Sequence, residues 1–280
     1  MAKIVGGIGT SHIPAIGLAM ARNECAQPYW KPFFDAYKPV REWLGAARPT
    51  VAVVIYNDHG LNFFLDKMPA FAIGAANEYR NADEGWGLPT LTPFPGDAAF
   101  SWHLIETLAA ADFDLTTCQE MLVDHGFVVP MQLMWPGATT WPVRTIPICV
   151  NTVQHPLPTP ARCLRFGEVL GKAIESWPAD ERVIVLGTGG LSHQLDGQRA
   201  GFINKPFDLY CLEKIVHEPA LLARYSIKEL IELAGTQGPE LIQWLMMRGA
   251  LGPKVRQLER NYHVPISNTG SGLMLLEKAA

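Results

Sequence analysis

The sequence is poor in charge, and its charged residues form no cluster. Only 18% of its 280 residues are charged, the net charge is −4, and no basic tract is present. Nucleic-acid-binding domains need a concentrated positive surface, so this composition argues against nucleic acid as a partner. The apolar runs are short and are broken by proline or charge, so we expect no membrane span.

Cysteine is also scarce. The five cysteines are odd in number and show no C-x-x-C spacing. This pattern favours free thiols over a disulfide framework or a cysteine zinc site. The first residues, MAKIVGGIGTSH, include no apolar segment of signal-peptide length, so we expect a cytoplasmic protein.

Hydrophobic residues are abundant, at 48% of the chain. A globular chain of this length buries a large core, and we find no internal repeat and no linker long enough to divide it. We therefore expect residues 1–280 to form a single α/β domain.

The segment Val51–Gly60, VAVVIYNDHG, is the clearest structural signal. Its unbroken apolar run predicts a strand buried on both faces of a sheet, which then ends in a polar corner at Asn57-Asp58-His59. Lys3–Gly9 and Arg182–Leu186 are similar runs, and they lead to His12 and His193. Because ligands gather beyond the carboxyl ends of such strands, these loops predict a functional site.

Other elements complete the expected sheet and its covering helices. Further strands are expected at Ala70–Gly74, Asp114–Cys118, Thr145–Val150 and Gly272–Leu276, and helices at Gly96–Phe113, Phe166–Trp177 and Glu240–Gly249. The last third of the chain reads as mostly helical, with Gly272–Leu276 closing the sheet. A fourth histidine, His125, follows Asp114–Cys118 in the loop Asp124-His125-Gly126.

Four histidines in equivalent positions after strands indicate a metal centre. Imidazoles held in separate loops can converge on one ion, and two histidines with one carboxylate form the site of non-haem Fe(II) oxygenases. Spacing alone does not select the carboxylate. The candidates are Asp58, Asp124, Asp196 and Glu240.

Motifs for other chemistries are absent or incomplete. Gly187-x-Gly189 follows a strand, but Ser192 stands where a dinucleotide fingerprint needs its third glycine. The sequence has neither a phosphate-binding P-loop nor a G-x-S-x-G nucleophile elbow. Ser267–Gly272 is a polar, glycine-bearing loop, which is either a simple turn or a contact for polar groups of a substrate.

Several blocks of the sequence are distinctive, and they include TSHIPAIG (10–17), YNDH (56–59), ADEGWG (82–87), VDHG (123–126), GTGGLSHQL (187–195), ELIQWLMMRGAL (240–251) and YHVPISNT (262–269). Together they resemble a known family, the type II (LigB-like) extradiol ring-cleaving dioxygenases, and within it the catalytic β subunits that act on protocatechuate. They cover nearly the whole chain in order. Gallate and methylgallate enzymes share most of them.

The resemblance implies a three-layer α/β/α sandwich around a mixed sheet, with Fe(II) held by His12, His59 and Glu240. It also implies that His193 is the catalytic acid/base and that His125 is a second catalytic residue, which faces the substrate.

The same resemblance implies substrate contacts and a reaction. Asn57 would orient the iron centre and its substrate, and Ser267 and Asn268 would lie near the ring carboxylate. The reaction would be cleavage of a catecholic acid such as protocatechuate by O2, giving a ring-opened muconic semialdehyde. Gallate and methylgallate are the alternative substrates.

The resembled enzyme works with a small helical α subunit, so we expect such a partner or a homodimer. Two other classes of function stay open: a zinc-dependent hydrolase that uses the same ligands, and a non-catalytic binding protein on the same fold.

Overall fold

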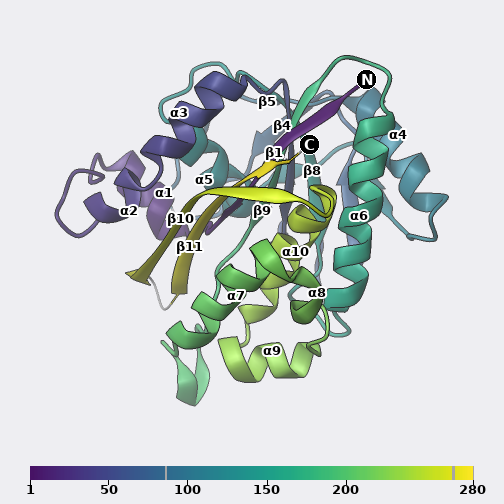
Figure 1. Ribbon diagram of the computed structural model, residues 1–280. Helices are drawn as coiled ribbons and strands as arrows, with labels where there is room; N and C mark the ends of the chain where they lie inside the picture. The colour runs from purple at the N-terminus through teal and green to yellow at the C-terminus, as the bar shows by residue number, and fades with distance from the viewer. Residues whose placement is uncertain (86, 267–268, 280) are drawn as a thin grey trace.

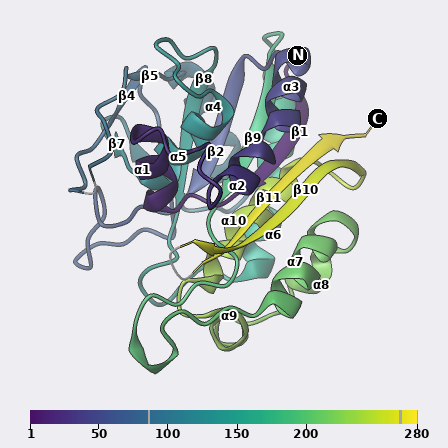
Figure 2. The ribbon, with the colours of Figure 1, turned by 90° about the vertical axis from the view of Figure 1, so that its left-hand side faces the viewer.

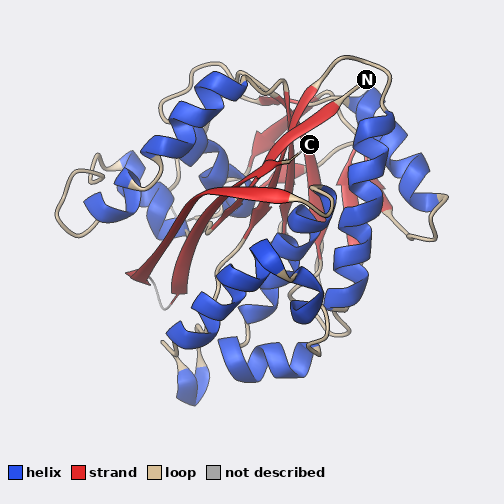
Figure 3. Cartoon of the chain, in the orientation of Figure 1, coloured by secondary structure: helices blue, strands red, loops and turns tan. Residues whose placement is uncertain are grey.

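The protein folds around one large mixed sheet with helices on both faces (Figures 1 and 3). The computed structural model describes residues 1–85, 87–266 and 269–279. The expected α/β/α architecture is confirmed. Within the described ranges, no helix has both the length and the apolar character that crossing a membrane requires. The five cysteines are free thiols, as expected.

The sheet has eight strands in the order β10-β11-β1-β9-β2-β8-β3-β6. In that order their bounds are Val255–Ile266, Thr269–Lys278, Lys3–Thr10, Arg182–Thr188, Val51–Tyr56, Arg144–Val150, Phe71–Gly74 and Thr116–Cys118. The four neighbours β1, β9, β2 and β8 run parallel to one another. Antiparallel pairing of β11 with β1, of β10 with β11 and of β3 with β8 makes the sheet mixed. A small second sheet joins β5 (Phe94–Pro95), β4 (Glu78–Asn81) and β7 (Leu122–Val123).

Two hydrophobic cores lie on opposite faces of the sheet. The side chains of β2 alternate between them: Val53 and Ile55 belong to one core, while Val54 and Tyr56 belong to the other. A strand buried on both faces needs such a continuous apolar run, as the sequence predicted.

The helices divide between the two faces (Figure 2). One face carries α4 (Ala98–Ala109), α6 (Pro160–Ser176), α7 (Lys205–His217), α8 (Pro219–Leu222), α9 (Ile227–Ala234) and α10 (Leu241–Ala250). The other carries α1 (Pro14–Ala21), α2 (Lys31–Asp35), α3 (Lys38–Ala47) and α5 (His125–Met134). Short 3-10 turns lie at η1 (Gly197–Arg199) and η2 (Gly238–Glu240).

The C-terminal third differs from its prediction. The strand expected at Gly272–Leu276 is longer, and it does not close the sheet, because β10 pairs outside it as the edge strand. The sequence of β10, VRQLERNYHVPI, is rich in charge and has no long apolar run. An edge strand is partly exposed, which explains why hydrophobic patterning did not find it.

Two other elements have bounds that differ from the expected ones, α4 and β6 (Thr116–Cys118). The helix expected at Gly96–Phe113 is α4, which begins after Asp97 because that carboxylate accepts a hydrogen bond from the Phe100 N–H. This is ordinary N-capping. Only Thr116–Cys118 of the segment Asp114–Cys118 forms a strand.

Helix α10 packs directly against the backbone of the central strands. A Cβ atom added at Gly9 would lie 2.4 Å from Cε3 of Trp244, and one added at Gly187 would lie 2.6 Å from the backbone oxygen of Gln243. Glycine at both positions is therefore what permits this close approach. The close approach of α10 brings its first residues, next to Glu240, to the carboxyl edge of β1 and β9.

Candidate metal centre and catalytic pocket

Three loops start side by side at the carboxyl edge of the sheet. In the parallel register Thr10 of β1 lies opposite Thr188 of β9, and Ile55 of β2 lies opposite Gly187. The segments that follow carry His12, His59 and His193. The predicted convergence of these loops is confirmed.

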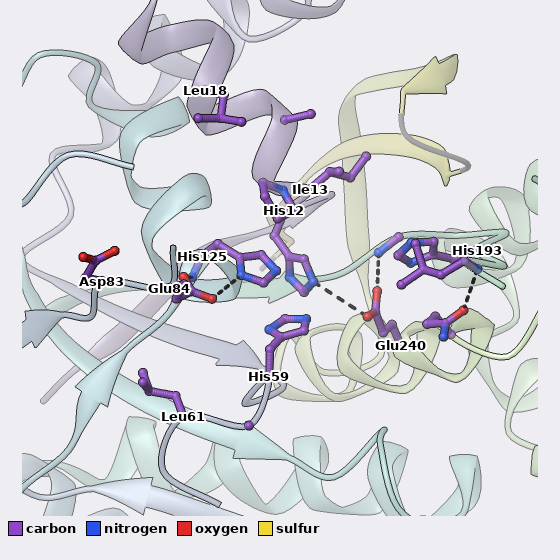
Figure 4. Close-up of a pocket in the computed structure, with 16 residues that line it drawn as sticks. His12, Ile13, Leu18, His59, Leu61, Asp83, Glu84, His125, His193 and Glu240 are labelled. Atoms are coloured by element: carbon purple, nitrogen blue, oxygen red, sulfur yellow. Dashed lines mark hydrogen bonds and ion pairs between the residues drawn. The ribbon is translucent and has the colours of Figure 1, made fainter. Parts of the chain in front are cut away.

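The loops enclose a cavity of about 720 Å³. Its lining includes all four histidines singled out in the sequence and Glu240: His12, His59, His125, His193 and Glu240 (Figure 4). Apolar side chains, among them Ile13, Leu18, Leu61 and Leu195, form much of the remaining wall. No lysine or arginine is among the described residues that line it.

His12 and Glu240 face each other in the buried part of the cavity. Nε2 of His12 lies 3.8 Å from Oε1 of Glu240, and both side chains are 4% exposed. The other imidazole nitrogen, Nδ1, lies 2.9 Å from the Thr188 hydroxyl. The second Glu240 oxygen accepts a hydrogen bond of 2.7 Å from the Gly190 N–H. These contacts leave His12 Nε2 and Glu240 Oε1 directed at the same space.

This separation fits two ligands of one ion. Bonds of about 2.1 Å from an ion to nitrogen and oxygen place neighbouring ligand atoms roughly 3–4 Å apart. Burial alone would raise the pKa of Glu240, but His12, His193 and His59 lower it to about 2. Burial lowers the pKa of His12. An ionised carboxylate and a neutral imidazole are the forms that bind metal.

His59 is oriented by a buried carboxylate. Oδ2 of Asp124 accepts hydrogen bonds from the His59 backbone N–H at 2.8 Å and from Nδ1 at 3.0 Å. Burial would lower the pKa of His59, but Asp124 and, more weakly, Glu240 outweigh it and raise the pKa to about 9. Carboxylates commonly hold metal-binding histidines in this way. Asp124 thus contacts a histidine instead of the cavity.

One buried side chain, Gln243 of α10, connects the two histidines. In either orientation of its amide, Gln243 bonds to both Thr188 and Asn57. Thr188 contacts Nδ1 of His12, and the Asn57 amide lies 2.9 Å from Nε2 of His59. The ring positions of His12 and His59 are therefore mutually constrained. Asn57 acts through His59 here and is not among the cavity-lining residues.

His125 lies two residues past the short strand β7, so its expected place after a strand holds, but it is the first residue of α5 and not a loop residue. Asp124 caps this helix by accepting a hydrogen bond from the Gly126 N–H. Glu84, in the loop between β4 and β5, accepts hydrogen bonds from both the backbone N–H and Nδ1 of His125, each at 2.7 Å. Sequence reasoning missed Glu84, although it belongs to the ADEGWG block.

The three imidazoles form a close cluster. Donor atoms of His12, His59 and His125 all lie within 4.8 Å of one another, and the His59 and His125 rings have centroids 4.0 Å apart. By distance alone, His125 is a candidate ligand as well as Glu240. Its Nδ1 is occupied by Glu84, so only Nε2 is available to the cavity.

His193 is held by its backbone. Its N–H donates to the Ala234 oxygen at 2.6 Å, and its carbonyl accepts from the Gln237 N–H at 3.1 Å. Its side chain lines the cavity, and Nδ1 is buried without a hydrogen-bond partner among the described residues. Burial lowers the pKa of His193, so the ring is neutral near pH 7 and can accept a proton.

The remaining predicted residues lie elsewhere. Asp58 accepts hydrogen bonds from the backbone N–H groups of residues 60–63 and so shapes the loop after β2. Asp196 is exposed in the loop after His193. Glu240 ends the η2 turn just before α10, where a helix spanning Glu240–Gly249 was expected. Ser267 and Asn268 lie outside the described residues.

Comparison with known proteins identifies the family. Residues 6–272 match the family described as "Catalytic LigB subunit of aromatic ring-opening dioxygenase". The chain belongs to this LigB family. The matched range includes every residue described above at the cavity.

Two individual relatives show which named dioxygenases the chain is similar to. A gallate dioxygenase from Pseudomonas putida is 40% identical over 196 residues, which cover 70% of this chain and 57% of the relative. A 2,3-dihydroxyphenylpropionate/2,3-dihydroxicinnamic acid 1,2-dioxygenase from Photorhabdus laumondii is 32% identical over 187 residues, covering 66% of this chain and 55% of the relative. The matched segments thus span little more than half the length of these relatives.

A solved structure supports the fold. An uncharacterized protein from Escherichia coli K12 superposes with a TM-score of 0.60 over 97% of this chain and 99% of that chain, at 13% sequence identity. At this identity the match concerns the fold alone.

Proposed function

We propose that this chain is the catalytic component of an Fe(II)-dependent extradiol dioxygenase that opens the ring of a catecholic acid such as protocatechuate. The observation that carries the proposal is the facing pair His12 and Glu240 beside His59, in a chain of the LigB family. The product with protocatechuate would be a ring-opened muconic semialdehyde. Gallate, the substrate named for one relative, and methylgallate are the alternatives.

The proposed ligands are His12 through Nε2, Glu240 through Oε1 and His59 through Nε2, from which a bound metal would displace the proton while Nδ1 keeps its bond to Asp124. The donor set of two imidazoles and a carboxylate suits Fe(II), and its open positions suit an oxygenase. Bound iron would favour the ionised form of a chelating catechol and bring the ring and dioxygen together. The chain's own contribution is to fix the ligands in advance, through Asp124, Thr188 and the Gln243 network.

His193 is the proposed acid and base. Because Nδ1 is buried, its neutral ring would accept the catechol proton at Nε2 and later return a proton to the product. His125 is proposed as the second catalytic group, held by Glu84 so that its Nε2 faces the substrate. Ile13 and Leu61 contribute apolar surface beside these groups, and Leu195, which is 54% exposed, would exclude water there only beneath a covering partner.

No lysine or arginine is among the described residues that line the cavity, so the ring carboxylate would be bound by donors other than these two side chains. Ser267 and Asn268 remain the proposed contacts, by family resemblance. Asn57 is proposed to orient the iron centre and, through it, the substrate.

We further propose that residues 1–280 form a single catalytic domain that works in the cytoplasm with a small helical subunit or as a homodimer. Support comes from Phe64 and Leu65, which are 56% and 70% exposed shortly after the cavity residue Leu61. Large exposed apolar side chains near a cavity suit a covering partner.

Oxygen uptake by anaerobically iron-loaded protein tests the proposal. The substrates are protocatechuate, gallate, methylgallate and unsubstituted catechol, with metal content measured on the same sample. Cleavage of a catechol that depends on iron supports the proposal. Stoichiometric zinc without oxygen uptake would favour a hydrolase, and failure to hold any metal would favour a binding protein.

A further inference from the structure

The loop that carries His193 is attached to a buried carboxylate, Asp208 of α7. Asp208 is 1% exposed. Its Oδ1 accepts hydrogen bonds from the Ser192 N–H at 2.9 Å and from the Ser192 hydroxyl at 2.7 Å, and its Oδ2 accepts one from the Tyr262 hydroxyl at 2.6 Å. Ser192 directly precedes His193.

No cation contacts this carboxylate among the residues that the structure describes. The groups that interact with it are Ser192, Tyr262 of β10 and Cys211 of its own helix, and none carries positive charge. A buried carboxylate without a cation is costly, and a hydrophobic residue would usually be more stabilising. Its presence beside His193 therefore calls for an explanation beyond stability.

Asp208 joins three segments at one point. Ser192 is bonded to β11 through the Gly270 N–H at 2.8 Å, and the Leu191 N–H donates to the Gly270 carbonyl at 3.0 Å. A Cβ atom at Gly270 would lie 2.4 Å from Oδ2 of Asp208, so β11 passes against the carboxylate itself. Tyr262 adds β10. The loop, α7 and the β10–β11 hairpin thus meet at Asp208.

The position of the His193 ring depends on these backbone contacts. Nδ1 of His193 has no hydrogen-bond partner among the described residues. In many acid/base sites a second side chain bonds the far nitrogen of the histidine and sets its orientation. Here the backbone must set it, and Asp208 anchors that backbone one residue before the imidazole.

We infer that Asp208 is a positioning residue, which holds the loop of His193 against the β10–β11 hairpin so that the imidazole reaches the substrate. The inference rests on the proposed function for its catalytic consequence. The claim that Asp208 fixes the position of the loop does not depend on the proposed function.

The central variant is Asp208→Ala in the full, iron-loaded chain. A misplacement of about 1 Å costs about 10²-fold in rate, so we expect kcat to fall by roughly 10–10² while iron content is unchanged. Asp208→Asn should restore most of kcat. Its carbonyl oxygen can accept both Ser192 bonds, and its NH2 group can donate to the Tyr262 oxygen.

A double-mutant cycle separates positioning from general destabilisation. If Asp208 acts through His193, Asp208→Ala should not lower kcat further in a His193→Gln background. The matched control is Ile215→Ala, which removes a buried side chain two turns further along α7. It should lower Tm and leave kcat unchanged.

Amide hydrogen exchange supplies a readout that does not need turnover. In Asp208→Ala the peptide covering residues 187–195 should exchange faster, and Asp208→Asn should resemble wild type. If Asp208→Ala does not fold, Ser192→Ala should show the same changes to a smaller extent, because it removes the hydroxyl bond to Asp208 and the bond accepted from the Asn204 N–H but keeps the Ser192 N–H bond to Asp208.

The inference is overturned if the exchange of 187–195 is unchanged, or if the kcat loss persists undiminished in the His193→Gln background. A decrease in kcat in Ile215→Ala equal to the decrease in Asp208→Ala would also overturn the inference. If wild type cleaves no catechol but the exchange results hold, the proposed function has failed and the positioning of the loop stands.

Discussion

Replacing Asp208 by asparagine should change how the stability of the fold depends on pH. Burial raises the pKa of Asp208 to about 6, against the opposing effect of the hydrogen bonds from Tyr262 and Ser192. In the unfolded chain the pKa is near 3.9. Between these values the folded state binds the proton and the unfolded state does not. This group therefore stabilises the fold below pH ~4, and its contribution is lost as pH rises through ~6.

The magnitude follows from the shift. A difference of about two pKa units corresponds to about 3 kcal/mol over the whole range. Between pH ~4.5 and ~7, linkage gives a loss of about 2 kcal/mol in the free energy of unfolding of wild type. Asp208→Asn has no titrating carboxyl group at this position, so it should not show this loss.

Urea unfolding of both metal-free proteins, followed by tryptophan fluorescence across this pH range, measures the difference. All other titrating groups are shared, so they largely cancel when the two free energies are subtracted. Tyr262→Phe serves as the control: it removes a hydrogen bond that lowers the pKa of Asp208, and the transition should move to higher pH. If the free energies of wild type and Asp208→Asn stay parallel, the reasoning about the buried carboxylate is wrong.

The remaining predictions concern the cavity. His12→Ala and Glu240→Ala should each lose iron and keep the circular dichroism of wild type. A folded Glu240→Ala that binds a full equivalent tightly would show that the carboxylate was misassigned. His193→Gln should keep iron and anaerobic substrate binding while turnover falls by about 10²–10⁴, the usual effect of removing a positioned proton-transfer group. Failure of this variant to hold iron would make His193 a ligand. Glu84→Gln should raise KM with iron content unchanged, because His125 loses its carboxylate acceptor, and an unaltered KM would exclude this role. Purified alone, the chain should turn over weakly; full activity from a monomer in light scattering would remove the need for a partner.

Sequence patterning succeeded where a local run of residues determines the structure. The apolar run of β2 fixes a strand that is buried on both sides, and the parallel register then places His12, His59 and His193 at one edge. These inferences need only the period of the side chains and the rule for strand ends.

Patterning failed where structure depends on which distant segments meet. Glu84 contacts His125 across 41 positions of sequence, and Gln243 contacts Asn57 across 186. A glutamate in a polar loop and a glutamine within an apolar helix look ordinary until the fold brings them to their partners. For the same reason spacing could not choose between Asp124 and Glu240, which differ only in what each one faces.

The close packing of α10 on the strands makes the cavity sensitive to positions that have no functional groups. Glu240 enters the cavity because Gly9 and Gly187 leave room for Trp244 and for the backbone of the helix. A methyl group at either glycine would collide with α10 and move the Glu240 carboxylate away from His12. The spacing of the proposed ligands thus depends partly on the absence of a Cβ atom at two glycines that are not themselves proposed ligands. A substitution as mild as alanine there would change metal affinity while leaving every proposed ligand in the sequence.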